Sequence, residues 1–210
     1  MIPLDIWSDP ICPWCYIGKA RLDRALESRP GHPFEIRWHP FQLNPDMPPD
    51  GMARDEYLTL KFGAEGLLHA YRPVIEAAEA TGLTLNLPAI TRTPNTLDAH
   101  RLIHWAGLEG RQGMVLDRLF RAYFQDARDI GDRGELITLA EAAGMERALV
   151  TRLMESEADR DMIREADKAA RARGIQGVPF FVLDNTHAIS GAQPTELWQQ
   201  VIDQITGHPA

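Results

Sequence analysis

The stretch that decides the fold reads Asp9-Pro10-Ile11-Cys12-Pro13-Trp14-Cys15-Tyr16. The residues before it, 3–8, are short and apolar-rich and end at the Asp9-Pro10 turn signal, which is typical of a β-strand. The residues after it carry apolar side chains at three- and four-residue spacing over 16–26 and stop at Pro30-Gly31. The pattern therefore predicts a strand followed by a helix, with both cysteines at the N-terminus of that helix.

The two cysteines are three residues apart, and the chain has no others. The partial positive charge of a helix N-terminus favours the thiolate of Cys12, and one helical turn brings Cys15 to the same face, within disulfide reach. Pro13 has no N–H to leave unpaired in the first turn, and Trp14 between the cysteines is expected to be exposed at the site. The spacing predicts thiol–disulfide exchange, in which Cys12 is the exposed attacking sulfur and Cys15 the more buried resolving one.

Three other interpretations of the cysteine pair compete with redox chemistry. The pair can be two unreactive core residues, or a structural disulfide, although so short a loop stabilises a protein only weakly. It can also be half of a zinc site, which needs four ligands; His100 and His104, four apart on a predicted helix, are the candidates to complete it. The strand-to-helix context favours the redox interpretation over all three.

The composition and net charge of the chain limit the kinds of molecule that it is expected to bind. The chain has 210 residues and a formal net charge of −8, which argues against general binding to nucleic-acid backbones. A disulfide-scaffolded secreted protein would have more cysteines, and more widely scattered ones. No apolar stretch approaches the length of a membrane span, and the N-terminus lacks the features of a signal peptide. We therefore expect no nucleic-acid or membrane partner, and a cytoplasmic location.

The order of the predicted elements indicates one split α/β domain. Residues 34–39 alternate apolar and polar side chains, so the first 40 residues predict strand, helix and strand with a parallel pair. Patterns from about 55 to 172 are almost all helical, and strands return at 178–183 and 187–190 before a final helix. We predict a discontinuous domain, 1–45 and 172–210, interrupted by an all-helical insertion, 46–171.

A second candidate part of the site lies about 165 residues after the dithiol. Gly177-Val178-Pro179-Phe180 comes directly before the returning strand. The first position of a strand is one of the few that tolerate proline, so Pro179 can be purely structural. Alternatively, Pro179 forms a cis-proline loop that turns the backbone of Val178 toward the dithiol, where it can pair with a substrate peptide or with glutathione.

Four motifs, in order along nearly the whole chain, resemble the DsbA-like branch of the thioredoxin superfamily, most closely its FrnE-like subgroup. They are Asp9–Gly18, Asn95–Arg101, Gly174–Phe181 and Ile189–Gln193. The resemblance implies a thioredoxin fold interrupted by a helical domain, a cis peptide bond before Pro179 and thiol–disulfide chemistry at Cys12. It also implies that the insertion covers the site, so that Asn95 or His100 faces the substrate; a capped helix with a solvated face is the alternative.

The chain departs from the superfamily at one position and from its relatives at another. Thioredoxins and DsbA carry a buried acid six residues before the first cysteine, where this chain has Ile6; Asp9 is the candidate proton relay for Cys15, unless it is an ordinary turn residue or cap. The related 2-hydroxychromene-2-carboxylate isomerases and kappa-class glutathione transferases place a serine where Cys12 stands. Cys12 therefore favours redox chemistry over the alternative, a glutathione-dependent isomerase or transferase acting on a small aromatic or polyketide-like substrate.

The expected partners follow from this chemistry. We predict no metal and no tightly bound cofactor, with glutathione as the co-substrate in the alternative function. The substrate is expected to be a protein or small molecule that carries a disulfide. Because no third cysteine can relay electrons, an external thiol reductant or oxidant must react with Cys12. Apolar faces on the insertion are compatible with a homodimer.

Overall fold

The computed structural model of the protein describes residues 1–207, without the side chains of residues 64–68. Its first 40 residues form strand β1 (Ile2–Ser8), helix α1 (Pro13–Ser28) and strand β2 (Phe34–Pro40). β1 and β2 pair in parallel, which confirms the predicted strand, helix and strand. The described helices include none that is both long enough and apolar enough to cross a membrane.

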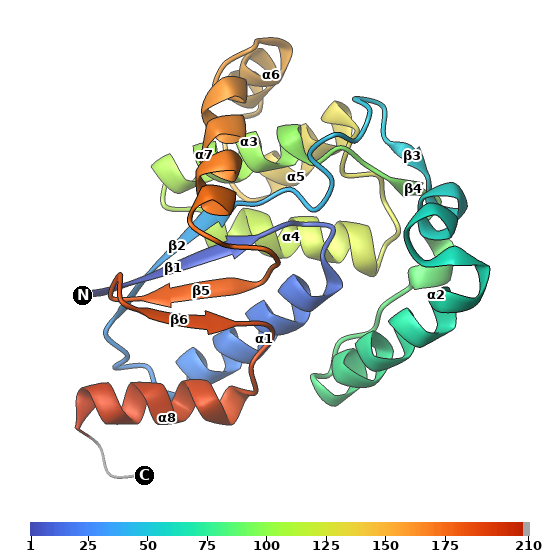
Figure 1. The fold of residues 1–210 in the computed structure, drawn as a ribbon. Coiled ribbons are helices and arrows are strands. Elements are labelled where there is room, and N and C mark those ends of the chain that lie inside the picture. The colour runs from blue at the N-terminus through green and yellow to red at the C-terminus, as the bar shows by residue number, and fades with distance from the viewer. Residues whose placement is uncertain (208–210) are drawn as a thin grey trace.

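A four-stranded sheet in the order β2-β1-β5-β6 forms the centre of the fold, with β5 (Phe180–Leu183) and β6 (His187–Ser190) antiparallel to their neighbours. Figure 1 shows α1 and α8 (Thr195–Thr206) together on one face of the sheet and α7 (Arg160–Ala172) on the other. Leu4 and Ile6 on β1 are fully buried in one cluster with Trp198 of α8. Segments from the two ends of the chain therefore contribute to one core.

The insertion is mainly helical, but the prediction that it is all helical is wrong, because it also contains two short strands. Met52–Ala53 (β3) and Arg92–Thr93 (β4) pair as a short antiparallel sheet, and strands of two residues are too short to leave a period in the sequence. Between them lies α2 (Arg54–Ala80), where Gly63 has a φ of 71° and breaks the helix into two segments. The remaining helices are η1 (Leu87–Ala89), α3 (Leu97–Leu108), α4 (Gln112–Phe124), α5 (Arg133–Ala142) and α6 (Arg147–Glu155).

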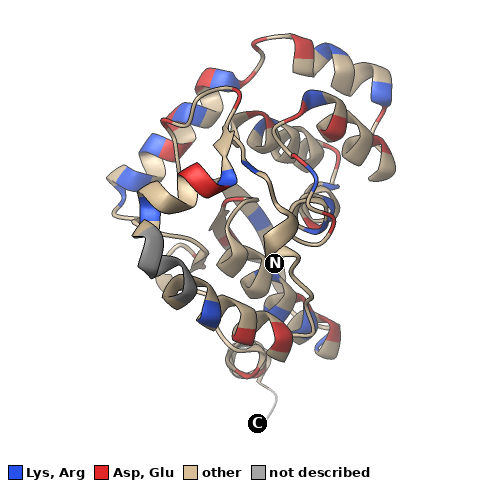
Figure 2. Cartoon of the chain, turned by 90° about the vertical axis from the view of Figure 1, so that its right-hand side faces the viewer, with Lys and Arg blue, Asp and Glu red and all other residues tan. Residues whose placement is uncertain are grey.

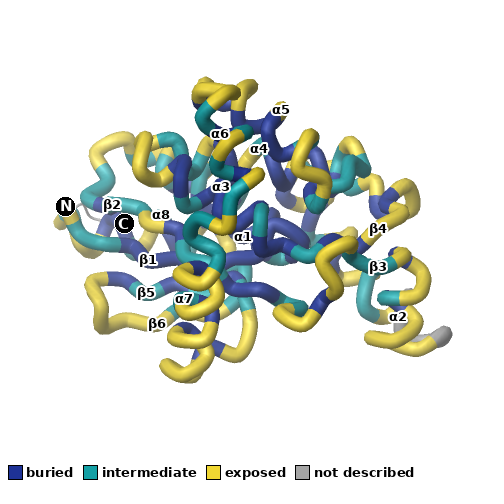
Figure 3. The backbone as a smooth tube through the Cα atoms, turned by 90° about the horizontal axis from the view of Figure 1, so that it is seen from above, coloured by how far each residue is buried: buried dark blue, intermediate teal, exposed yellow. Residues whose placement is uncertain are grey.

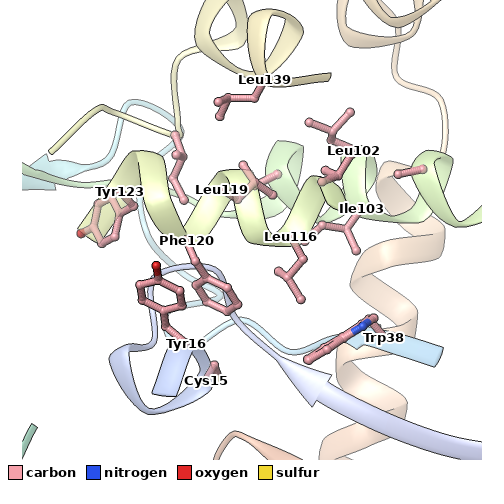
Figure 4. Close-up of a cluster of buried hydrophobic side chains, with 14 of the residues drawn as sticks. Cys15, Tyr16, Trp38, Leu102, Ile103, Leu116, Leu119, Phe120, Tyr123 and Leu139 are labelled. Carbon is pink, nitrogen blue, oxygen red and sulfur yellow. The ribbon is translucent and has the colours of Figure 1, made fainter. Parts of the chain in front are cut away.

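Helix α4 joins the insertion to the sheet. Figure 4 shows Leu116 and Phe120 of α4 reaching toward Tyr16 and Cys15 of α1, and all four belong to one buried cluster. Figure 3 shows the centre of this shared core as buried, and much of α2 and β6 as exposed. The partition into 1–45 with 172–210 and 46–171 stays a prediction, because the two parts share this core.

Candidate active site

The dithiol lies at the start of α1. Cys12 is the N-cap residue with extended backbone angles, φ −89° and ψ 114°, and Pro13 is the first helical residue. The two cysteines are reduced and 3.4 Å apart. Cys15 is 0% exposed and Cys12 is 4% exposed. Cys15 is therefore the more buried of the two, as predicted, but the expected exposed Cys12 is wrong, because the neighbouring segments cover its side chain.

The loop before β5 packs directly against Cys12. The Cys12 thiol donates to the carbonyl oxygen of Val178 at 3.5 Å, and the peptide bond between Val178 and Pro179 is cis. Trp14 is half-buried instead of exposed, because it packs against a small cluster that contains Ile17 of α1 and Val74 of α2. The tertiary structure thus brings Cys12, Cys15 and the Val178-Pro179 loop together.

Gly18 is a residue of the site that the sequence did not single out. A methyl group added to its Cα would lie 3.0 Å from Cγ of Pro179 and 3.4 Å from Cα of Ala192. A glycine here therefore allows the cis-proline loop to approach α1 closely. A glycine inside a predicted helix was the available signal, since glycine at such a position lowers helix stability and needs a packing reason.

We expect Gly18→Ala to bring no gain in stability, whereas Gly113→Ala in α4 raises the free energy of unfolding by up to about 1 kcal/mol. Helix propensity favours alanine at both positions, but a methyl group on Gly113 meets no atom within 4 Å. The difference therefore measures the conflict with Pro179. Urea unfolding of the two variants tests it, and equal gains would contradict the close approach.

The surroundings of Cys15 disfavour its thiolate. Burial raises the pKa of Cys15 well above its ordinary value, and the adjacent Cys12 raises this pKa further. The neighbouring Ser8 hydroxyl and the backbone N–H of Asp9 lower this pKa but do not offset the burial. Ser8 is 3% exposed, and a lone serine at the end of a strand gave no sequence signal of this role. Cys15 therefore needs a nearby group to take its proton before it can attack.

Asp9 is an acid buried beside the dithiol. Its carboxylate accepts hydrogen bonds from the N–H groups of Leu43, at 2.6 Å, and Ile11, at 3.4 Å, so it fixes the loop that follows β2. The side chain is 0% exposed, and this burial raises the pKa of Asp9 to about 7 in spite of these hydrogen bonds. Asp9 therefore titrates near neutral pH, unlike an ordinary turn residue.

His100 lies next to Asp9 in the interior. Its Nε2 is 3.7 Å from Oδ1 of Asp9, and this buried nitrogen has no hydrogen-bond partner in the part of the chain that the structure describes. Burial lowers the pKa of His100 to about 4, so the imidazole is neutral at neutral pH. Asn95 donates to the Met47 carbonyl at 2.6 Å and accepts from the N–H of Leu97 at 2.9 Å. Substrate contact by Asn95 or His100 stays a prediction.

The structure does not support the interpretation of the cysteine pair as half of a zinc site. Over residues 1–207, with the side chains of 64–68 set aside, no group of three or more His, Cys, Asp or Glu residues is arranged to hold a metal ion. Among the described residues, Cys12, Cys15, His100 and His104 therefore form no such group. The dithiol is thus a pair of free thiols at a helix start.

Comparison with known proteins agrees with this geometry. The model of the DSBA-like thioredoxin domain family matches residues 3–203. The crystal structure of a "probable DsbA oxidoreductase" from Streptomyces coelicolor is similar, with a TM-score of 0.84 and 34% identity over 100% of this chain and 92% of that one. An uncharacterized protein of Bacillus subtilis, YwbO, is 28% identical over 96% of both chains. A 2-hydroxychromene-2-carboxylate isomerase shares the fold, with a TM-score of 0.73 and 16% identity over 99% and 100% of the two chains.

Proposed function

Because the chain belongs to the DSBA-like thioredoxin domain family, we propose that it is a thiol–disulfide oxidoreductase in which Cys12 attacks and Cys15 resolves. The observation that carries the proposal is the position of two free cysteines, 3.4 Å apart at the start of α1, with the carbonyl of Val178 against Cys12. Pro13, Trp14, Val178 and Pro179 then form the surface on which the substrate disulfide lies.

The reaction has two exchanges. The thiolate of Cys12 attacks one sulfur of the substrate disulfide, a Cys12–substrate disulfide forms, and the other substrate sulfur leaves as a thiolate that takes up a proton. Cys15 then loses its proton and attacks the sulfur of Cys12, which releases the second substrate thiol and leaves a Cys12–Cys15 disulfide. The substrate gains two electrons and the dithiol loses them, and an external thiol reductant restores the dithiol. The reverse sequence makes the protein an oxidant, according to its potential against that of the compartment.

Asp9 is our candidate for the acceptor of the Cys15 proton. Its backbone N–H lowers the pKa of the Cys15 thiol, and its own carboxyl has a pKa of about 7 inside the fold. A carboxyl with this pKa is partly ionised at neutral pH and so can receive a proton from a buried thiol. This role replaces the acid that thioredoxins carry six residues before the first cysteine, where Ile6 stands here.

Turnover of insulin or of glutathione disulfide by wild type, Cys12→Ser and Cys15→Ser tests the function. We expect Cys12→Ser to lose turnover, because the attacking sulfur is gone. In Cys15→Ser the reaction is expected to stop after the first exchange. One of the two halves of the substrate disulfide then stays bound to Cys12 as a mixed disulfide, which intact-protein mass spectrometry detects as added mass. Equal turnover in wild type and Cys12→Ser would overturn the proposal.

The glutathione-dependent alternative and the cytoplasmic location stay predictions. Calorimetry of the reduced protein with glutathione tests the glutathione-dependent function directly, since an isomerase or transferase of this kind must bind reduced glutathione. Fractionation of the source cells tests the cytoplasmic location. Neither result changes the exchange chemistry proposed for Cys12 and Cys15.

A further inference from the structure

His100 of α3 is a buried polar residue with an unpaired nitrogen. The residue is 3% exposed, and its Nε2 has no hydrogen-bond partner in the described part of the chain. An unpaired buried nitrogen is rare in proteins, because it costs free energy, and it therefore points to a role beyond packing. Nε2 lies 3.7 Å from Oδ1 of Asp9. This separation is longer than a hydrogen bond, but a movement of about 1 Å brings the two atoms to hydrogen-bond distance.

The proton of Asp9 has no direct access to water. The Asp9 side chain is 0% exposed, and burial raises its pKa to about 7, so the protonated and ionised forms are both present at neutral pH. Only the ionised form can accept the Cys15 proton in the proposed reaction. A molecule whose Asp9 is protonated must therefore lose that proton to water before Cys15 can attack.

Three other polar groups near the Asp9 carboxyl offer no path for its proton. Two are the backbone N–H groups of Leu43 and Ile11, which donate to it. The third is the Thr96 side chain, which lowers the pKa of Asp9 and whose hydroxyl is 3.5 Å from the amide nitrogen of Gln42. Backbone and side-chain amides neither gain nor lose protons near neutral pH, so a path through these groups ends at them. An imidazole differs, because it can accept a proton at one ring nitrogen and release one from the other.

His100 also lines a cavity that opens to water, which we call the α3–α7 cavity. The cavity has a volume of about 330 Å³ and lies between β2, α3 and α7. Figure 1 shows α7 passing close to α3 and to the end of β2. Two other residues of its lining, Leu108 and Met162, are 77% and 40% exposed, so water reaches the cavity. His100 is therefore adjacent both to Asp9 and to a cavity that opens to solvent.

Burial, rather than a surface of one charge, sets the protonation of His100. Burial lowers its pKa to about 4, although the nearby Asp167 carboxylate and the backbone of Phe41 raise it, so the imidazole is neutral at neutral pH. Asp167 itself accepts hydrogen bonds from the N–H of Gln42 at 2.8 Å and from Arg171 at 3.0 Å. Figure 2 shows Lys and Arg interspersed with Asp and Glu along the helices. The titratable and charged groups around His100 come from four segments: Asp9 after β1, Arg37 and His39 of β2, His104 of α3 and Asp167 of α7.

We propose that His100 carries protons between Asp9 and the water of the α3–α7 cavity. A protonated Asp9 gives its proton to Nε2 of His100, which leaves a carboxylate and an imidazolium. The imidazolium then gives a proton to water or to a buffer base, and the Asp9 carboxylate is free to accept the proton of Cys15. The imidazolium is short-lived, because the pKa of His100 is below that of Asp9. The inference rests on the proposed oxidoreductase function and deepens it, since it names the residue that keeps Asp9 in exchange with solvent.

A single turnover of dithiobis(nitrobenzoate) tests the proposal, because this disulfide releases one coloured thiolate in each exchange. Stopped-flow mixing separates the two exchanges, since the second is intramolecular and its rate does not depend on concentration. At pH 6 most molecules hold Asp9 protonated. In His100→Gln we expect these molecules to complete the second exchange roughly tenfold or more slowly than molecules with ionised Asp9, so that it divides into two phases. The slow phase should shrink as the pH rises to 8, because Asp9 is then already ionised.

His104→Gln is the matched control, because His104 lies one turn further along α3 and lines the same cavity. Wild type and His104→Gln are expected to complete the second exchange in a single phase at every pH. Three results would overturn the inference: a single phase in His100→Gln at pH 6, a slow phase of the same size in His104→Gln, or equal slowing of His100→Gln at pH 6 and pH 8. Equal slowing at both pH values is what a purely structural role of His100 predicts.

Heteronuclear NMR of the histidine ring nitrogens in wild type is a second measurement, which needs neither a folded His100 variant nor redox chemistry. The proposal requires Nε2 of His100 to carry no proton at pH 6. It also requires the Nε2 resonance to change as Asp9 ionises between pH 6 and 8, and this change should be absent in Asp9→Asn. A proton on Nε2 at pH 6, or a resonance that does not change, would overturn the role of His100. Failure of the proposed function is seen separately, as equal turnover of disulfides by wild type and Cys12→Ser, whatever the NMR result.

Discussion

As the pH rises from 4 to 7, the free energy of unfolding of Asp9→Asn is expected to increase relative to that of wild type. As the pH rises from 4 to 6.5, the free energy of unfolding of His100→Gln is expected to decrease relative to that of wild type. The predicted changes are opposite in sign and amount to about 4 and about 3 kcal/mol. They follow from two buried groups whose pKa values are displaced in opposite directions, about 7 for Asp9 and about 4 for His100.

The sign follows from which state binds more protons. Between pH 4 and 7 the folded protein keeps Asp9 protonated while the unfolded chain has lost that proton, so ionisation of Asp9 makes wild type less stable as the pH rises. Between pH 4 and 6.5 the unfolded chain holds a proton on His100 that the folded protein lacks, so His100 makes wild type more stable as the pH rises. In wild type the two effects nearly cancel, and each single variant removes one of them.

Urea unfolding of wild type, both single variants and the double variant across pH 4–8 measures these differences. Burial is the main cause of both displaced pKa values. His100 Nε2 lies 3.7 Å from Asp9 Oδ1, so the two titrations are coupled and the effects of the two substitutions do not simply add. Comparing the double variant with the two single variants measures this coupling. If the free energy of unfolding of each single variant changes with pH in the same way as that of wild type, the burial of these two ionisable groups is contradicted.

The same Asp9→Asn variant tests the proton acceptor. An amide cannot take the Cys15 proton, so the second exchange should slow relative to the first, and the mixed disulfide should accumulate during turnover. Quenching the reaction in acid and weighing the intact protein gives the amount of this intermediate with time. An intermediate no more abundant than in wild type would contradict the role of Asp9.

Arg101→Met is expected to lower the free energy of unfolding by about 4 kcal/mol, because it removes a fully buried guanidinium together with the hydrogen bonds that it donates. The side chain is 0% exposed and lies in α3. It donates to Asp98 at 2.8 Å and to three carbonyl oxygens at 2.7–2.8 Å, that of Leu153 in the last turn of α6 and those of Ser156 and Ala158 in the segment between α6 and α7. Its loss leaves the carbonyl oxygens of Ser156 and Ala158 without this charged donor, whereas Asp98 keeps Arg133 and the Leu153 carbonyl keeps Ser156.

Arg133→Met is the matched control for Arg101→Met. Arg133 binds the same carboxylate of Asp98 at 2.9 Å, but its side chain is 45% exposed and water can replace it. Its loss is expected to cost less than about 1 kcal/mol. Urea denaturation at neutral pH compares the two, and costs that agree within about 1 kcal/mol would show that the Arg101 network contributes little beyond an exposed ion pair.

Most of the local structure and the order of its elements could be predicted from the sequence. Alternating and helical patterns of apolar side chains predicted β1, α1, β2, β5, β6 and α8, because burial on one face of an element imposes a period on its residues. The dithiol at the start of α1 was also predictable, since strand, turn signal and helix lie within a few consecutive residues. The same patterns could not predict β3 and β4, which are too short to have a period.

Which polar groups are buried, and which groups they contact, could not be predicted without the packed fold. Asp9 and His100 are 91 residues apart and Arg54 and Tyr123 are 69 apart, yet each pair meets in the interior. An aspartate at a turn or an arginine at a helix start has the same sequence pattern whether water or protein surrounds it. Burial raises the pKa of Asp9 and surrounds the Arg54 guanidinium with the neutral hydroxyls of Thr93, Tyr123 and Tyr71. Burial depends on segments that are distant in the chain. Local sequence patterns therefore cannot predict the burial of these polar groups, because desolvation is a property of the packed fold.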